Sequence, residues 1–394
     1  MQPIGTHDPL DYMNVVLDLI ENEAYFASKI TNWSAIRQQA RIMGGNAKTT
    51  QETYPAIEMV LERMGHQHSY LIPAETRQWN PAQLSHVTYG FSVLRNERRV
   101  IQVLPGSPAD NADISVGDTI MALDDQMLKP SDTLPDFDQM QRTIKITLKK
   151  HTNEELLYAL ITPRTMVRDA LPHGHRIDDW GYLELPGLHD TPTHDMYIRM
   201  ARDTIHTVSE AKRVKGWVID VRRNQGGNIW PMLAAIGTIL GTGDWGKFIR
   251  RDKQEEVWHY ENGGTRLGDV VMASLPLEMD EPDYSTVPVA LLQSPLTSDA
   301  GEILLIAFKG REKARTFGKP SKGIPTLNTG FPLSDGARLI LTTAACADRN
   351  GNVYQDSLQV HQDIATDWAH FGSAADPVLQ AALNWLNTQN EADD

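Results

Sequence analysis

One segment decides the fold of this chain: Val287-Pro-Val-Ala-Leu-Leu-Gln-Ser-Pro-Leu-Thr-Ser-Asp-Ala-Gly-Glu302. Its apolar first half predicts a buried strand, and the apolar run over residues 303–308 predicts a helix that follows it. The turn between them carries Thr297, Ser298 and Asp299. A hydroxyl at the first turn of a helix lies beside backbone N–H groups that have no partner in the helix and that stabilise a developing anion. The turn is therefore a candidate nucleophile site.

The same turn has a purely structural interpretation. Asp299 followed three residues later by Glu302 matches a capping box, in which two residues each accept a backbone N–H of the other. In that interpretation Thr297, Ser298 and Asp299 only begin the helix. The segment taken alone leaves both interpretations open.

Composition and charge limit the class of protein. With 394 residues the chain is too long for one ordinary core, and 41% hydrophobic with 22% charged residues is typical of globular proteins. The 37 basic and 51 acidic residues give a net charge of −14, so nucleic acid is not an expected partner. Because Cys346 is the only cysteine, an intramolecular disulfide and a cysteine zinc cluster are excluded.

The first residues mix acidic and apolar side chains, unlike the core of a signal peptide, and no apolar run reaches membrane-spanning length. We therefore expect no membrane partner. We expect a cytoplasmic location for the sequence as it stands, or a periplasmic or secreted one if a signal was removed. Nothing in the sequence indicates an oligomeric state.

The hydrophobic pattern divides the chain into three parts. Residues 1–84 show helical spacing and end in a polar linker over residues 75–83, residues 85–165 change to short β runs, and residues 166–394 alternate strands and helices. In the last part we predict strands over 217–222, 287–292 and 338–343 and helices over 228–240, 302–308 and 377–388. The expected fold class is a multidomain α+β protein with a helical N-terminal region, a small β domain and an α/β core.

The β part closely resembles the middle of a PDZ domain. The residues that carry this resemblance are Pro105-Gly106-Ser107-Pro108-Ala109, Ala112, Ile114 and Gly117-Asp118-Thr119-Ile120. Tyr89-Gly90-Phe91 stands where such domains have their carboxylate-binding loop, whose backbone N–H groups hold a chain-terminal carboxylate while a strand edge accepts the peptide. The alternative is a plain turn at Gly90 with Tyr89 and Phe91 in the core.

A second motif is the glycine pair that ends Asp220-Val-Arg-Arg-Asn-Gln-Gly-Gly227. Gly226 and Gly227 follow a predicted strand and allow the backbone to approach a ligand closely. Their N–H groups can point at an oxyanion, which is one half of an acyl-transfer site. The alternative is a tight turn with no catalytic role.

Together these motifs resemble the tail-specific, or C-terminal-processing, serine peptidases over most of the chain. The matching stretches, in the order of that family, are residues 65–73, 216–227, 297–302, and 315–323 with 331–336 and 341–343, with the PDZ-like part between the first and the second. The resemblance implies a crotonase-like (ClpP-like) α/β peptidase core after the helices and the PDZ domain. It also implies no metal or organic cofactor, and a peptide or an unfolded protein end as substrate.

The chain departs from that family at two positions. The serine of the family corresponds to Asp299, which leaves Ser298 as the nearest hydroxyl on the turn. The lysine of the Ser-Lys branch corresponds to Ile324, whereas residues 318–323 resemble the Gly-Glu-Pro-Thr-x-Gly segment of the tricorn-like and retinoid-binding-protein-like branch. That branch uses a histidine base, which makes His68 the candidate. The alternative for His68 is a helix-end histidine bonded to backbone.

Two functions remain open at this point. In the first, Ser298 and His68 catalyse peptide hydrolysis, and Gly226 and Gly227 bind the oxyanion beside Asp299, so that His68 is expected within hydrogen-bond reach of the turn.

In the second, the protein is catalytically silent and binds chain ends through Tyr89-Gly90-Phe91, because a carboxylate at Asp299 opposes the charge of a tetrahedral intermediate. The pairs His66/His68 and His173/His175 show no third ligand at useful spacing, so we predict no metal site.

Overall fold

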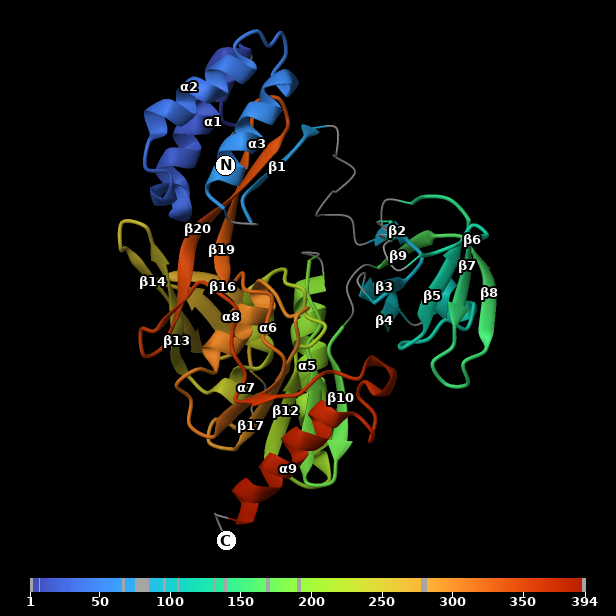
Figure 1. The fold of residues 1–394 in the computed structure, drawn as a ribbon. Coiled ribbons are helices and arrows are strands. Elements are labelled where there is room, and N and C mark those ends of the chain that lie inside the picture. The colour runs from blue at the N-terminus through green and yellow to red at the C-terminus, as the bar shows by residue number, and fades with distance from the viewer. Residues whose placement is uncertain are drawn as a thin grey trace.

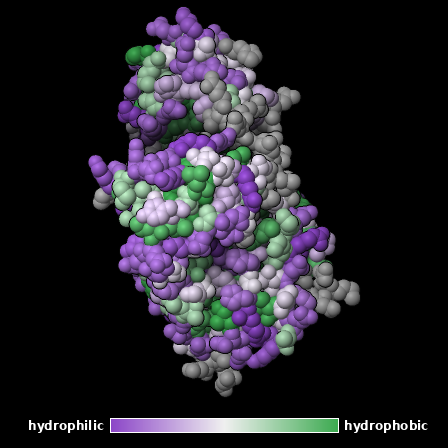
Figure 2. All heavy atoms as spheres, turned by 90° about the vertical axis from the view of Figure 1, so that its right-hand side faces the viewer, coloured by the Kyte–Doolittle hydropathy of each residue, from purple (hydrophilic) through white to green (hydrophobic). Residues whose placement is uncertain are grey.

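The computed structural model describes the chain except for residues 1–2, 7, 66–67, 75–84, 95–96, 105, 130–131, 133, 136, 138–139, 168–170, 190–192, 278–281 and 392–394. The predicted linker over residues 75–83 and the histidine His66 lie outside the described residues. The described chain is a mixed α/β protein with several hydrophobic clusters (Figure 1). In Figure 2, hydrophilic residues cover most of the face turned to the viewer, and hydrophobic ones form scattered patches.

The N-terminal helices are α1 (Pro9–Glu23), α2 (Trp33–Gly44) and α3 (Tyr54–Arg63), with the 3-10 turns η1 (Tyr25–Lys29) and η2 (Gln51–Thr53) between them. Helix α1 begins where Asp8 accepts two backbone N–H groups, and α2 begins after Asn32, which accepts the N–H of Ala35. Asn32 is thus the N-cap of α2. The helices share one hydrophobic cluster with residues 331–341 of the C-terminal half.

This shared cluster forms on a long hairpin. Strands β19 (Thr326–Pro332) and β20 (Arg338–Asp348) pair antiparallel and extend upward to the helices, and β1 (Tyr70–Ile72) adds to β20 (Figure 1). At the tip of the hairpin, Asp335 accepts the hydroxyls of Tyr12 and Tyr54 at 3.0 and 2.7 Å. The helical region is therefore fixed to the core by apolar packing and by a shared carboxylate.

Residues 85–167, named the β module, form a separate antiparallel sheet with its own hydrophobic cluster. The sheet runs in the order β3 (Phe91–Leu94), β4 (Arg99–Val103), β5 (Thr119–Leu123), β7 (Ile144–Lys149) and β8 (Leu156–Ile161), with β6 (Gln126–Met127) on β5. Strands β2 (Ser85–Thr88) and β9 (Arg164–Val167) pair with each other, and α4 (Pro108–Asn111) follows β4. These strands agree with the short β runs expected for this part of the sequence.

The remaining chain contains a second sheet in which most strands are parallel. Its order is β10 (His173–Ile177), β11 (Trp180–Glu184), β12 (Gly216–Asp220), β17 (Val289–Gln293), β18 (Ala314–Gly318) and β22 (Gln362–Asp363). Only β10 is antiparallel to its neighbour. Every residue of β12 and β17 is buried, as expected for parallel strands covered on both faces.

Helices cover both faces of this sheet. Helix α9 (Pro377–Glu391) packs on one face, and α5 (His194–Glu210), α6 (Ile229–Ala235), α7 (Gly237–Leu240) and α8 (Ala300–Ala307) belong to the cluster on the other. The predicted single helix over residues 228–240 is wrong, because the chain breaks at Ile236 between α6 and α7. Gly237 lies so close to Tyr260 that a Cβ there would be 1.9 Å from the ring, so this position has no room for a side chain.

Sequence reasoning missed a third, antiparallel sheet. Strands β13 (Gly243–Arg250), β14 (Glu255–Glu261), β15 (Gly264–Leu267) and β16 (Val270–Ser274) form consecutive hairpins, and β13 pairs with β20, which also carries β21 (Val353–Tyr354). The predicted strand over 338–343 is the first half of β20, which continues to Asp348. This sheet lies against α8 and supports it from the side opposite the parallel sheet.

Candidate active site

The parallel pairing of β12 with β17 brings two turns together. Asp220 is opposite Leu292 at the carboxyl ends of the strands, the edge at which open α/β sheets place their ligands. The N–H of Ser298 donates to the carbonyl of Asn224 at 3.0 Å, and the Thr297 hydroxyl donates to the carbonyl of Val221 at 2.8 Å. The turn after β17 and the Gly-Gly turn after β12 therefore form one site.

Asp299 is the N-cap residue of α8 and has a strained backbone. Its φ of 52° and ψ of −118° lie outside the regions that residues other than glycine favour. A sharp strand-to-helix turn of this kind is where hydrolases expose a nucleophile. The Asp299 N–H donates to Glu302 at 3.0 Å, and the predicted capping box forms. The elbow position of this chain is thus occupied by a carboxylate.

The Asp299 carboxylate is held by donors from three elements. Its Oδ2 accepts the N–H of Gly227 at 3.4 Å, its Oδ1 accepts from Asn328 Nδ2 at 3.3 Å, and the N–H of Ala300 also donates to it. Burial raises the pKa of Asp299 to about 6, while the Gly227 and Ala300 N–H groups act in the opposite direction. The carboxylate is therefore mostly ionised at neutral pH and protonated in mild acid.

The predicted oxyanion glycines lie beside this carboxylate, and both of their N–H groups have acceptors. Gly226 donates to Asn224 Oδ1 at 3.0 Å, and Gly227 donates to Asp299. Both have positive φ, and a Cβ would lie 2.7 Å from Asp299 Oδ2 at Gly226 and 1.9 Å from the Leu188 carbonyl at Gly227. Only glycine fits at either position, and the donors that an oxyanion would use are occupied.

His68 reaches the turn through a residue that sequence reasoning did not single out. Asn328, on β19, places its Nδ2 3.0 Å from His68 Nδ1 and 3.3 Å from Asp299 Oδ1. The Thr342 hydroxyl donates to Asn328 Oδ1 at 2.9 Å and so orients the amide. The structure thus connects His68 and Asp299 by one bridging amide. No motif marks Asn328 in the sequence, because its role depends on the pairing of β19 with β20.

Ser298 precedes the elbow and does not occupy it. The residue is 2% exposed, and its N–H is bound to Asn224. Ser298 is therefore buried in the turn. The strained residue, at the position where a nucleophile elbow exposes its nucleophile, is Asp299.

Glu302 ties the downstream segment to the turn. The side chain is fully buried and accepts the Ser321 hydroxyl at 2.5 Å and the N–H groups of Gly323 and Ile324 at 2.8 and 2.9 Å. Burial raises the pKa of Glu302, and these donors oppose the rise. Ile324, which corresponds to the lysine of the Ser-Lys branch, is a buried apolar residue beside this carboxylate.

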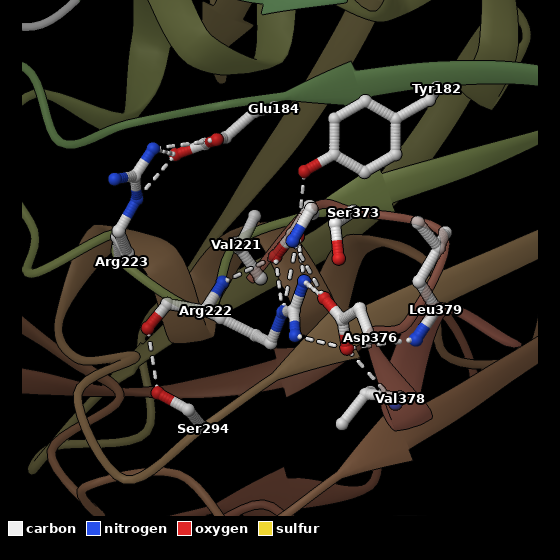
Figure 3. A network of polar contacts seen from close by, with 12 residues as sticks. Tyr182, Glu184, Val221, Arg222, Arg223, Ser294, Ser373, Asp376, Val378 and Leu379 are labelled. Carbon is white, nitrogen blue, oxygen red and sulfur yellow. Dashed lines mark hydrogen bonds and ion pairs between the residues drawn. The ribbon is translucent and has the colours of Figure 1, made fainter. Parts of the chain in front are cut away.

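Behind the site lies a buried ionic network (Figure 3). Arg222 is fully buried and contacts Asp220 at 2.7 Å and Asp376 at 2.6 Å, and the Tyr182 hydroxyl donates to Asp220 at 2.9 Å. The carbonyl of Arg222 accepts the Ser294 hydroxyl, so the network fixes the start of both turns. Asp376 also accepts the first N–H groups of α9, which joins the C-terminal helix to the site.

In the β module, Tyr89 and Phe91 are 1% and 7% exposed and belong to the hydrophobic cluster. Their side chains therefore lie in the core, as the alternative interpretation expected, and a peptide could meet only their backbone. Gly90 has a φ of 82°, and its N–H donates to the Thr88 hydroxyl at 3.1 Å. Strand β3 is at the end of its sheet.

Within the described residues, no three histidine, cysteine or acidic side chains gather closely enough to hold a metal ion. None of the helices in the described part of the chain has the length and apolar character needed to span a bilayer.

The fold and the site define the class of protein. The structure superimposes on the photosystem II D1 C-terminal processing protease with a TM-score of 0.59 and 16% identity, covering 91% of this chain and 94% of that one. Residues 179–366 match peptidase family S41. Over these residues the chain is similar to the tail-specific proteases of that family, as its C-terminal-processing relatives also indicate.

Two curated relatives are similar to parts of this chain. The nisin-resistance protein of Lactococcus lactis subsp. lactis is 24% identical over 255 residues, which are 64% of this chain and 73% of that protein. The carboxy-terminal-processing protease of Bartonella bacilliformis is 24% identical over 262 residues, 65% of this chain and 56% of that protein. The match thus spans little more than half the length of the second relative.

The buried network predicts a stability effect at Asp376. Asp376→Ala leaves the buried Arg222 with one carboxylate and removes the cap of α9, so we expect the free energy of unfolding to fall by about 3–5 kcal/mol. Asp376→Asn, which keeps a cap acceptor, should lose less. Urea unfolding followed by circular dichroism measures both, with the exposed Asp269→Ala as control; an unchanged midpoint in Asp376→Ala would contradict the prediction.

The pKa of Asp299 predicts a pH dependence of stability. Because the folded pKa, about 6, lies above the ordinary aspartate value of 3.8, the protonated form favours folding. The associated stability is complete below the unfolded pKa and is lost as the pH rises through about 6. Relative to Asp299→Asn, the wild type should lose about 2–3 kcal/mol between pH 4 and pH 7. Parallel stability curves for the two proteins across this range would refute the prediction.

Proposed function

We propose that this S41 protein is a catalytically silent member of its family that binds peptide or protein chain ends. The observation that carries the proposal is the position of the Asp299 carboxylate, which lies at the elbow and accepts the N–H groups of Gly227 and Ala300. Preorganised donors of this kind supply several kcal/mol to acyl transfer only when they face the developing oxyanion. Here they face a fixed negative charge.

The alternative is hydrolysis by Ser298 with His68 as base, as in a tail-specific serine endopeptidase. Family membership favours peptidase chemistry in general. Against Ser298 stand its burial and its position one residue before the elbow. A tetrahedral intermediate formed there would also carry its charge beside Asp299, which like-charge repulsion disfavours.

For chain-end binding we assign three parts: residues 1–84 as a helical region, residues 85–165 as a PDZ-like domain, and residues 166–394 as a crotonase-like core. The antiparallel sheet of the β module, with β3 at its end and Gly90 at positive φ just before β3, supports the PDZ-like assignment. A strand at a sheet edge offers unpaired backbone groups to an extended peptide. The helices on both faces of the parallel sheet support the assignment of the core.

Cleavage assays distinguish the two functions. Wild type should not hydrolyse casein or unstructured peptides, whereas Asp299→Ser should gain activity, because it places a hydroxyl at the elbow and frees the Gly227 and Ala300 donors. Adding His68→Ala to Asp299→Ser should remove at least about a hundredfold of the gained rate, the usual effect of losing a general base.

Thermal unfolding of each variant controls for correct folding. Wild-type activity that Ser298→Ala abolishes would reject the silent assignment and establish Ser298 as the nucleophile.

Binding of chain ends has its own test in the full-length protein. A peptide with a free C-terminal carboxylate should bind about tenfold tighter than the same peptide amidated, the effect of one charge-assisted hydrogen bond. Gly90→Ala should remove the preference, because a Cβ there would lie 2.1 Å from Ser107 Cβ and displace the loop. Fluorescence anisotropy measures both affinities. Equal binding of the two peptides would rule out a carboxylate-binding loop.

A further inference from the structure

The two ends of α8 differ in charge. Its N-terminal end holds Asp299, whereas its C-terminal end, after Phe308, borders a separate pocket of about 200 Å³. The polar residues that line the pocket include Lys309, Arg311, Thr316 and His361. Since α8 has 8 residues, its ends are about 12 Å apart, and the pocket does not belong to the candidate active site.

Four cations gather around this pocket. Lys309 and Arg311 line it, and Arg349 packs its Cγ 3.0 Å from the Cβ position of Gly310. Arg315 does not line the pocket: its guanidinium lies over the Phe317 ring, and it acts on His361 through space. Among the residues that the structure describes, no ion pair involves any of the four, although the chain carries a net charge of −14. In so acidic a protein, cations normally find carboxylate partners.

The carboxylates that act on these cations already accept hydrogen bonds from other groups. The charge of Asp348 favours the charged forms of Lys309 and Arg349 and so acts to raise their pKa. Asp348 itself is only 2% exposed. Its oxygens accept the backbone N–H groups of Asn350 and Asn352 and the hydroxyl of Tyr354. The charge of Asp283 acts to raise the pKa of Arg311, but the two side chains form no ion pair within the described structure. The cationic group is therefore incompletely neutralised by the described chain.

Buried donors in this group also have no acceptor. The Nε atoms of Arg311, Arg315 and Arg349 are buried and have no hydrogen-bond partner in the described part of the chain. Arg311 is 9% exposed, and its terminal nitrogens donate to the carbonyls of Tyr284, Val287 and Glu312. Burial lowers the pKa of Arg311 to about 10, and the charge of Arg349 adds to this effect. A desolvated donor without an acceptor is unfavourable, and an anion oxygen would satisfy it.

His361 adds a further donor. Its Nδ1 accepts the backbone N–H of Thr316 at 3.1 Å, and because a backbone N–H can only donate, the ring proton of neutral His361 is on Nε2. Burial, and then the charges of Lys309 and Arg315, lower the pKa of His361 and keep the ring neutral. The Thr316 hydroxyl is bound to His361. The other polar side chains that line the pocket, Lys309, Arg311 and His361, can donate hydrogen bonds to a ligand.

The end of the helix explains only part of this arrangement. Arg349 Nη2 donates to the carbonyl of Ala307 at 2.8 Å, and cations near a helix C-terminus interact favourably with its dipole. That dipole is equivalent to about half an elementary charge, however, far less than the charge of four cations. It also leaves the Nε donors without acceptors.

We propose that this pocket binds a phosphate group, either as the free anion or on a small phosphomonoester. A phosphate offers oxygens that only accept hydrogen bonds from guanidinium and imidazole donors, and at neutral pH it carries more negative charge than a single carboxylate. The volume suits one such group with few additional atoms. The site is independent of whether the elbow is catalytically active.

The test uses the full-length protein with inorganic phosphate and glycerol 3-phosphate as probes, and chloride and acetate at equal ionic strength as controls. Saturable binding in isothermal titration calorimetry and a melting temperature that rises with phosphate concentration are expected. Tighter binding of glycerol 3-phosphate would identify a monoester, and equal binding would identify the free anion. Phosphate behaving like acetate would overturn the proposal.

Variants locate the binding. Lys309→Gln should weaken phosphate binding by about tenfold or more, the effect of removing one charged donor. His361→Ala, which removes a donor that lines the pocket, should also weaken it and replaces Lys309→Gln if that variant unfolds. Lys48→Gln, which removes the same charge from an exposed position in the helical region, is the matched control. Equal loss in Lys48→Gln, or wild-type affinity in both pocket variants, would overturn the assignment.

Discussion

The parallel pairing of β12 with β17 is the constraint on which the rest of the structure depends. It places the carboxyl ends of two buried strands side by side, and each strand ends in a turn whose polar groups bind the other. Because the strands are covered on both faces, their turns have no freedom to separate. The elbow at Asp299, the glycines at 226–227 and the buried Arg222 all take their positions from this pairing.

A single carboxylate then changes what the site can do. In a family of peptidases, the donors after an elbow are available to a substrate oxygen. In this chain the Asp299 carboxylate itself accepts hydrogen bonds from those donors through Oδ2, and its Oδ1 accepts one from Asn328. The strained backbone of the elbow persists, because α8 and the Glu302 contacts over-determine it. Under the proposed function, the chain keeps the strained elbow while the charge of Asp299 opposes an anionic intermediate.

The two ends of helix α8 lie beside side chains of opposite charge. Its N-terminal N–H groups receive an internal carboxylate, whereas its C-terminal end gathers lysine and arginine residues. Both placements agree with the helix dipole. The carboxylate at the N-terminal end accepts hydrogen bonds from donors of the chain itself, whereas three arginine Nε atoms near the C-terminal end have no acceptor among the described residues.

The sequence by itself determined the local features of the protein. The burial of β12 and β17, the glycines at 226–227, the capping box at Asp299 and the missing family serine are all readable within short windows, because a strand, a turn or a cap depends on neighbouring residues. Only the tertiary structure decided that Asn328 links His68 to Asp299, that Asp376 pairs with Arg222, and that Arg349 joins the cations after α8. These contacts join residues far apart in the chain, and their partners follow from strand register and helix packing, which leave no periodic pattern in the sequence.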